Sequence, residues 1–180
     1  MRLLANPWRG TGLGDPALDL IPLPSTDAAR PKALLARCPK AATTPLRALP
    51  DLAARAGVAR FDVKDESGRM GLGSFKALGA AYVIARDAEA GRAAGATYVA
   101  ASAGNHGLSV AAGARVFRAR AVIYLAETVP EAFADRLRAE GAEVVRAGAT
   151  YEASMEAASE AARAKGWQLL SDSSWPGYLE

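Results

Sequence analysis

The sequence has almost none of the residues from which disulfides and metal centres are built. Its 180 residues include one cysteine, Cys38, and one histidine, His106. A single cysteine excludes an intramolecular disulfide and a single histidine excludes a histidine-rich metal site, so we expect no metal. Cys38 precedes Pro39 in an expected loop, which favours a bystander over a nucleophile. His106 has no acidic partner at motif spacing, which favours a structural role over a general base.

Long apolar runs and clusters of basic residues are absent as well. No stretch approaches the roughly 20 apolar residues that a membrane-spanning helix needs, and the first residues hold no apolar stretch long enough for a signal peptide. The net charge is +3, but the arginines are scattered and are not gathered with aromatic residues, which disfavours nucleic-acid binding. We therefore expect a cytoplasmic protein that binds neither a membrane nor nucleic acid.

The expected helices and strands divide the chain into two parts. Residues 1–58 hold most of the prolines, which predicts an extended segment with short helices at 32–37 and 51–56. Residues 59–180 predict an α/β domain, in which strands alternate with helices. The strands are expected at 60–64, 97–101, 121–125, 143–146 and 167–170, and the helices at 74–92, 105–117, 130–140 and 151–165. This alternation needs crossover connections, hence a mainly parallel sheet covered by helices on both faces.

Lys76 is the first candidate for chemistry. It follows Ser74 and Phe75 at the start of an expected apolar helix, for which Ser74 is the candidate N-cap. We expect Lys76 to lose much of the water that keeps its ammonium charged, and the positive end of the helix dipole acts in the same direction. An amine kept neutral in this way is a nucleophile. A solvated surface lysine is the alternative that the sequence leaves open.

The second candidate is the turn Ser102-Ala103-Gly104-Asn105-His106-Gly107, between an expected strand and an expected helix. Its glycines would let an anion approach the backbone, while Ser102 and Asn105 offer side-chain hydrogen bonds. Ligands of parallel sheets bind beyond the carboxyl ends of the strands, where this turn lies. A helix cap at Asn105 is the simpler alternative. A nucleophilic lysine facing an anion-binding turn suggests a site for pyridoxal phosphate (PLP).

The motifs resemble those of the fold-type II PLP enzymes, the group of tryptophan synthase β and threonine dehydratase. Ser74-Phe75-Lys76 and the turn at 102–107 carry this resemblance. Three further stretches resemble diaminopropionate ammonia-lyase more than a dehydratase, namely Thr43-Thr44-Pro45-Leu46, residues 63–72 and Asp172-Ser173-Ser174-Trp175-Pro176-Gly177-Tyr178. The likeness covers nearly the whole chain and implies the three-layer αβα fold of fold-type II enzymes.

The resemblance implies a reaction and assigns roles in it. The reaction is the PLP-dependent α,β-elimination of 2,3-diaminopropionate to pyruvate and ammonia, in which PLP takes up the electrons left by Cα–H cleavage. Lys76 would bind the PLP aldehyde as a Schiff base and, once freed, would take the Cα proton. Phe75 would pack against the pyridine ring, and Asn105 would hydrogen-bond to the ring hydroxyl.

The other implied roles concern the substrate, a small amino acid. Ser102, with backbone N–H groups near Gly104 and Asn105, would hold the substrate carboxylate. Tyr151 and Asp172 match positions that line the substrate pocket, and Asp172 could pair with the second amino group. A surface helix position for Tyr151 and a loop cap for Asp172 are the alternatives. The resemblance also implies a homodimer.

The chain departs from the family pattern in two ways. Ala103 stands where the lyases usually carry an acidic residue, so we expect activity limited to the L-isomer, with Lys76 as the sole base. Alanine at this position is also familiar from threonine dehydratases, which keeps a threonine or serine dehydratase open as an alternative. Family members are also much longer and hold the PLP phosphate with a glycine-rich loop that this chain lacks. We therefore expect an incomplete chain, inactive alone, or a non-catalytic remnant.

Overall fold

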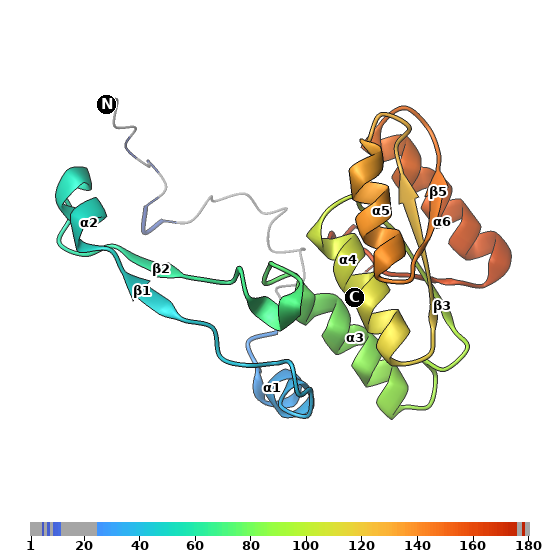
Figure 1. The fold of residues 1–180 in the computed structure, drawn as a ribbon, viewed down its shortest axis with the longest axis horizontal. Helices are drawn as coiled ribbons and strands as arrows, with labels where there is room; N and C mark the ends of the chain where they lie inside the picture. Colours follow the sequence, from blue (N-terminus) through green and yellow to red (C-terminus); the bar gives the residue numbers. More distant parts are fainter. Residues whose placement is uncertain (1–4, 6, 8, 12–24, 176–177, 179–180) are drawn as a thin grey trace.

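The structure, a computed structural model, describes residues 5, 7, 9–11, 25–175 and 178. Residues 1–4, 6, 8 and 12–24 of the proline-rich segment lie outside the described residues. Figure 1 shows an α/β body from which a thin arm extends to one side, with the short helix α1 (Ala29–Leu35) between them.

A four-stranded parallel sheet forms the centre of the body. Its strands are β3 (Thr97–Ala101), β4 (Arg120–Leu125), β5 (Glu143–Arg146) and β6 (Gln168–Leu169), in the order β5-β4-β3-β6. Thr97 pairs with Arg120, Val122 with Glu143, and Tyr98 with Gln168. The chain leaves β3 towards β4 on one side, and returns much later to place β6 on the other side. The carboxyl ends of β3 and β6 therefore flank a topological switch point, where sheets of this kind bind ligands.

Helices cover both faces of this sheet. On one face lie α4 (Asn105–Val116) and α5 (Glu131–Ala139), with α3 (Ala77–Glu89) packed on α4; α6 (Tyr151–Lys165) covers the other face (Figure 1). Each face has its own apolar core, the first centred on Ile84, Val110, Ile123 and Leu137, and the second on Val99, Val122, Tyr124 and Ala158. The expected three-layer αβα architecture is confirmed.

The arm is an antiparallel hairpin. Strands β1 (Leu46–Ala48) and β2 (Asp62–Lys64) pair, with Leu46 opposite Lys64, and α2 (Pro50–Ala56) lies in the connection between them. Gly57 ends α2 with φ 66°, which confirms the expected glycine cap. All six strand residues are exposed. The predicted domain boundary between residues 58 and 59 falls inside this hairpin and stays a prediction.

Most expected elements are confirmed with small shifts at their ends, two begin later than expected, and strand β1 was not expected. The helix expected from Ser74 begins at Ala77, because the hydroxyl of Ser74 accepts a hydrogen bond from the N–H of Lys76 in a turn that precedes the helix. The strand expected at 60–64 keeps only its last three residues. A 3-10 helix at Arg69–Gly71, with Met70 at φ 52°, was not expected.

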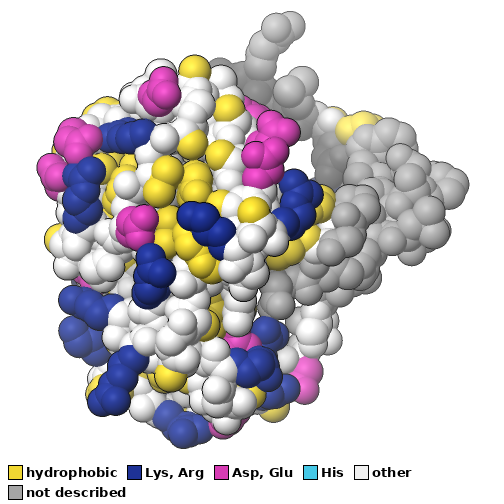
Figure 2. Space-filling model, turned by 90° about the vertical axis from the view of Figure 1, so that its right-hand side faces the viewer, with side chains coloured by type: hydrophobic (Ala, Val, Ile, Leu, Met, Phe, Trp, Pro, Cys, Tyr) yellow, Lys and Arg dark blue, Asp and Glu magenta, His cyan; other side chains and the backbone are white. Residues whose placement is uncertain are grey.

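The surface carries charges of both signs. On the face shown in Figure 2, basic and acidic side chains are interspersed around an apolar area, without a large region of one sign. Among the described residues, no helix is both long and apolar enough to cross a membrane. The same residues contain no group of three or more histidine, cysteine, aspartate or glutamate side chains that could hold a metal ion.

Candidate active site

Lys76 lies directly before α3, at the edge of the body where the parallel strands end. The first turn of α3 is tied to α4 by the hydroxyl of Ser109, which donates a hydrogen bond of 3.1 Å to the carbonyl oxygen of Ala77. This contact is buried, and it holds the lysine next to the helix that begins at Asn105.

Asp172 is the partner of Lys76. The Nζ atom of Lys76 donates a hydrogen bond to Oδ2 of Asp172 in an ion pair. The side chain of Lys76 is 42% exposed and that of Asp172 is 28% exposed. The expectation of a dry lysine is therefore not met in this structure, because the side chain of Lys76 is partly exposed and is paired with a carboxylate.

Asp172 interacts electrostatically with Lys76 and with two further residues, His106 and Tyr151. Burial alone would raise the pKa of Asp172, but the hydrogen bond from Lys76 and the charges of His106 and Lys76 outweigh it, so the pKa lies below its ordinary value. The pKa of Tyr151 is raised, first by partial burial and then by the negative charge of Asp172, while Lys76 opposes the shift. Tyr151, at the start of α6, thus lies within electrostatic range of the ion pair.

The turn after β3 is held closely around the start of α4. The hydroxyl of Ser102 accepts a hydrogen bond of 3.3 Å from the N–H of Gly104. A Cβ atom at Gly107 would lie 2.3 Å from the carbonyl oxygen of Ser102, so only glycine fits there. Within the described part of the chain, the N–H groups of Asn105, His106 and Gly107 have no hydrogen-bond acceptor. The turn therefore presents donors suited to an anion.

Two other predicted residues have exposed side chains here. Phe75 is 62% exposed, and Asn105, the first residue of α4, is also exposed. Both lie on segments that adjoin the Lys76–Asp172 pair, and neither makes a side-chain hydrogen bond within the described residues. The packing of Phe75 on a ring and the hydrogen bond of Asn105 to a ring hydroxyl stay predictions.

Comparison with known proteins decides the family. The pyridoxal-phosphate dependent enzyme family matches residues 39–180. The chain belongs to this family. It is 32% identical over 164 residues to the diaminopropionate ammonia-lyase of Salmonella typhimurium, a match that covers 80% of this chain and 41% of that protein. For the Escherichia coli K12 enzyme the identity is 36% over 153 residues, covering 76% and 38%. An L-threonine dehydratase of Pasteurella multocida is 33% identical over 130 residues, covering 72% and 25%.

Solved structures place the fold among the fold-type II members of the family. The apo form of Escherichia coli diaminopropionate ammonia lyase matches with a TM-score of 0.78 and 30% identity, covering 84% of this chain and 46% of that chain. The same enzyme in complex with an aminoacrylate-PLP azomethine reaction intermediate matches with a TM-score of 0.78 and 32% identity, covering 84% and 42%. Threonine deaminase isoform 2 of Solanum lycopersicum matches with a TM-score of 0.67 and 27% identity, covering 78% and 39%. The chain spans about two-fifths of the length of the curated relatives it matches.

The cofactor of this family is PLP. The described residues fit the aldehyde of that molecule, because they bring together a primary amine, a carboxylate and a glycine-bearing turn with unused N–H groups. A solvent-accessible amine is also what an incoming aldehyde requires.

Near the site, sequence reasoning favoured a structural role for His106 and gave no role to Tyr178. His106 is buried, and its Nε2 atom lies 2.9 Å from the carbonyl oxygen of Leu170. Because a carbonyl only accepts, this nitrogen must carry the hydrogen, which agrees with the structural role favoured for His106. The hydroxyl of Tyr178 accepts a hydrogen bond of 2.7 Å from the N–H of Ser171. The signal that could have found it is the Trp-x-Gly-Tyr motif that closely follows Asp172.

The motifs at 43–46 and 63–72 meet in a polar cluster of Thr44, Lys64, Glu66 and Arg69. Glu66 accepts hydrogen bonds from the guanidinium of Arg69, at 2.6 and 2.7 Å, and from the hydroxyl of Thr44. Lys64 donates to the carbonyl oxygen of Thr44. The hydrogen bonds from Arg69 and Thr44 lower the pKa of Glu66 to about 2. The cluster fixes the base of the arm against the segment that leads to Lys76.

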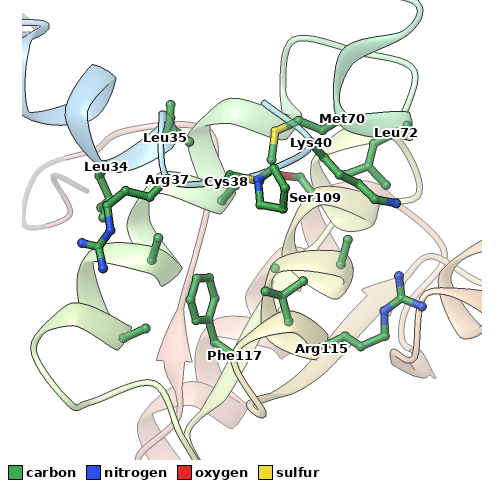
Figure 3. A pocket seen from close by; sticks show the side chains of 18 of the residues that line it. Leu34, Leu35, Arg37, Cys38, Lys40, Met70, Leu72, Ser109, Arg115 and Phe117 are labelled. Carbon is green, nitrogen blue, oxygen red and sulfur yellow. The ribbon is translucent and has the colours of Figure 1, made fainter. Parts of the chain in front are cut away.

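A cavity of about 700 Å³ lies between α1, α3 and α4 (Figure 3). Its walls are mostly apolar, with Leu34, Leu35 and Phe117 among them, and Lys40 and Arg115 point to the same side of it. Neither Lys76 nor Asp172 lines this cavity. It is therefore separate from the candidate active site.

Proposed function

We propose that this chain carries the lysine-bearing part of a PLP-dependent lyase that eliminates ammonia from 2,3-diaminopropionate, giving pyruvate and ammonia. The observation that carries the proposal is the contact between Lys76 and Asp172 beside the turn at 102–107. The identities of 32–36% to diaminopropionate ammonia-lyases support the choice of substrate.

Lys76 supplies the amine that joins the cofactor and, when released from it, the base that takes the Cα proton. Bound PLP supplies the electron sink for that step. In the structure the amine is held by Asp172, so it has to exchange this partner before it can act. A substrate with a second ammonium group offers Asp172 a replacement of the same charge. Binding of the diamine would thus free Lys76 and place the leaving amino group at Asp172.

The start of α4 offers hydrogen-bond donors for the carboxylate end of the substrate. The unused N–H groups of Asn105, His106 and Gly107 and the hydroxyl of Ser102 are donors on one turn, and the positive end of the helix dipole favours an anion there. We assign them to the substrate carboxylate. With the carboxylate at α4 and the second amine at Asp172, the Cα–H bond would be directed towards Lys76. Tyr151 would close the pocket from the start of α6.

The role of Lys76 can be tested without catalysis. The chain is incubated with PLP, reduced with borohydride, and mapped by peptide mass spectrometry. We expect a pyridoxyl group on Lys76 and its loss in Lys76→Ala, with the other lysines modified only at background level. Equal modification of Lys76 and of exposed lysines such as Lys32 would contradict the proposal.

The role of Asp172 can be tested by substrate choice in the PLP-loaded chain. Because a hydrogen bond to a charged group contributes about 1.5–3 kcal/mol, Asp172→Asn should weaken the binding of L-2,3-diaminopropionate by about 10- to 100-fold. The binding of L-serine, which has no second amine, should change little. Equal weakening for both ligands would contradict the assignment.

A threonine or serine dehydratase is the second candidate function. The similarity to an L-threonine dehydratase and the alanine at position 103 favour it. It would use the same lysine and turn but expel water, and its activity on L-threonine should survive Asp172→Asn. The family resemblance further leads us to propose a homodimer, which sedimentation velocity would test.

A further inference from the structure

The backbone just before Asp172 has a hydrogen-bond partner at four consecutive polar groups, from the carbonyl oxygen of Leu169 to the N–H of Ser171. The N–H of Leu170 donates to the carbonyl oxygen of Val99 at 2.8 Å, which is the last hydrogen bond to the sheet. Beyond this bond β6 has ended, and side chains provide the hydrogen-bond partners of the backbone. His106 donates to the carbonyl oxygen of Leu170, while the hydroxyl of Tyr178 donates to the carbonyl oxygen of Leu169 at 3.3 Å and accepts from the N–H of Ser171.

We infer that Tyr178 and His106 are positioning residues, which direct Asp172 at Lys76 by fixing the backbone on its amino-terminal side. The inference rests on the proposed function, in which Asp172 receives the second amine of the substrate. A carboxylate has to stay within a few tenths of an ångström of its donor, because a displacement of about 1 Å ends a hydrogen bond. Position 172 lies three residues beyond the end of a two-residue strand, and short strand ends without ladder partners open readily.

The hydroxyl of Tyr178 reaches this backbone because the chain turns back after Asp172. The rings of Trp175 and Tyr178 stack with centroids 4.4 Å apart and planes 15° from parallel. The N–H of Tyr178 donates to the carbonyl oxygen of Trp175 at 2.9 Å, which holds Tyr178 beside Trp175. The hydroxyl of Ser171 adds a hydrogen bond of 3.2 Å from the N–H of Ser173. The residues on both sides of Asp172, Ser171 and Ser173, are thus held by hydrogen bonds.

His106 links the loop of Asp172 to the turn that holds the start of α4. Its imidazole is buried, as is Leu170, whose carbonyl it binds. The residue next to His106 in the chain is Asn105, one of the proposed substrate ligands. One side chain therefore sets the spacing between the donors at the start of α4 and the carboxylate of Asp172, which are the two ends of the proposed substrate site.

The test measures the contact between Asp172 and Lys76 in the chain without cofactor. Each variant is methylated with formaldehyde and cyanoborohydride, and the rate at Lys76 is read by peptide mass spectrometry relative to Lys165. Asp172→Asn removes the partner of Lys76 and sets the fastest rate. Tyr178→Phe removes only a hydroxyl and keeps the stack on Trp175. The matched control is Tyr98→Phe, which removes a hydroxyl that donates to Asp87 at the opposite end of the same sheet.

We expect Tyr178→Phe to accelerate the methylation of Lys76 by about 2- to 10-fold, the effect of losing one or two ordinary hydrogen bonds, and Tyr98→Phe to leave it at the wild-type rate. His106→Gln, which keeps an N–H donor, should react as wild type does, whereas His106→Leu should be faster. Wild-type rates in both Tyr178→Phe and His106→Leu would overturn the inference. So would a rate in Asp172→Asn equal to that of the wild type, or equal acceleration by Tyr98→Phe, which would indicate general loosening.

The outcome is independent of the proposed reaction. Methylation needs neither PLP nor substrate, so a chain that fails to take up PLP can still show, or fail to show, the effect of Tyr178. Hydrogen exchange gives a second measurement, since the N–H of Ser171 loses its acceptor in Tyr178→Phe. Its exchange should be faster by a similar factor, and unchanged exchange would also overturn the inference.

Discussion

Replacing glycine by alanine at position 79 and at position 107 should change the stability of the fold in opposite directions. Gly79 lies on the exposed side of α3, and a Cβ atom there would meet nothing within 4 Å. Replacing a helical glycine by alanine in open space stabilises the fold by about 1 kcal/mol. At Gly107 in α4, the same atom would lie 2.3 Å from the carbonyl oxygen of Ser102 and 3.1 Å from Cδ2 of Leu137. Real contacts are never so short, so the turn after β3 would have to move.

The expected change in the free energy of unfolding for Gly107→Ala combines a cost of overpacking and a gain in helix propensity. Overpacking costs about 1–3 kcal/mol, and the upper part of the range applies where the obstacle is backbone. The gain in helix propensity offsets about 1 kcal/mol of it. Gly107→Ala should therefore lower the free energy of unfolding by about 1–2 kcal/mol. For a chain of this length, 1 kcal/mol corresponds to about 2–4 °C in Tm. We expect Gly107→Ala to lower the Tm by about 2–8 °C and Gly79→Ala to raise it by about 2–4 °C.

Thermal unfolding followed by circular dichroism at 222 nm measures both values. Gly113→Ala provides an intermediate, because its Cβ would meet Cδ1 of Ile84 at 2.9 Å, and the end of a side chain can turn aside. We expect the highest Tm for Gly79→Ala, an intermediate Tm for Gly113→Ala and the lowest Tm for Gly107→Ala. A Gly107→Ala protein that melts at or above the wild-type temperature would refute the geometry of the turn on which the candidate site depends.

Three further predictions concern the core, the pH dependence and the stereochemistry. Leu137 is fully buried, so Leu137→Ala should cost about 2–5 kcal/mol in a denaturant titration. Because the folded-state pKa of Glu66, about 2, lies below its ordinary value of 4.5, its contribution to stability is present above pH 4.5 and is lost as the pH falls towards 2; the protection of amides around Arg69 from hydrogen exchange, relative to their intrinsic rates, should fall in that window, and not in Arg69→Met. The PLP-loaded chain should bind L-diaminopropionate and not the D-isomer, and Ala103→Asp should relax this preference; equal affinity of the wild type for both isomers in a binding titration would contradict it.

The elements that sequence reasoning placed correctly have strong local signals. Strand β3 is a short apolar run that ends at the Ser102 turn, and its predicted bounds are confirmed. The bounds of α6 are confirmed too, because both ends have caps: the hydroxyl of Thr150 accepts from the N–H of Ala153 at 3.2 Å, and Gly166 ends the helix with φ 65°. The start of α3 was placed too early, since the Ser74 hydroxyl closes a turn there and does not cap the helix.

The contacts of the candidate site could be predicted only in part. Lys76 and Asp172 are separated by 96 positions, and no spacing rule connects residues so far apart. Asp172 entered the predicted site through the resemblance alone, and the choice of Lys76 as its direct partner had no signal in the sequence. The parallel sheet explains the meeting physically: the turn at 102–107 and the loop of Asp172 follow neighbouring strands, so their carboxyl ends share one edge.

In the arm, the sequence pattern predicted a strand correctly, but the apolar side chains of that strand are not buried. The alternation around Phe61 and Val63 is typical of a half-buried strand, and β2 does form and pair with β1. Yet Phe61 is 38% exposed and Val63 37%. An alternating pattern predicts which side of a strand packs against other residues, but it does not say which residues those are. The described residues provide no packing surface for this hairpin. The apolar side of the arm is therefore a feature of the sequence that the fold of these residues leaves unused.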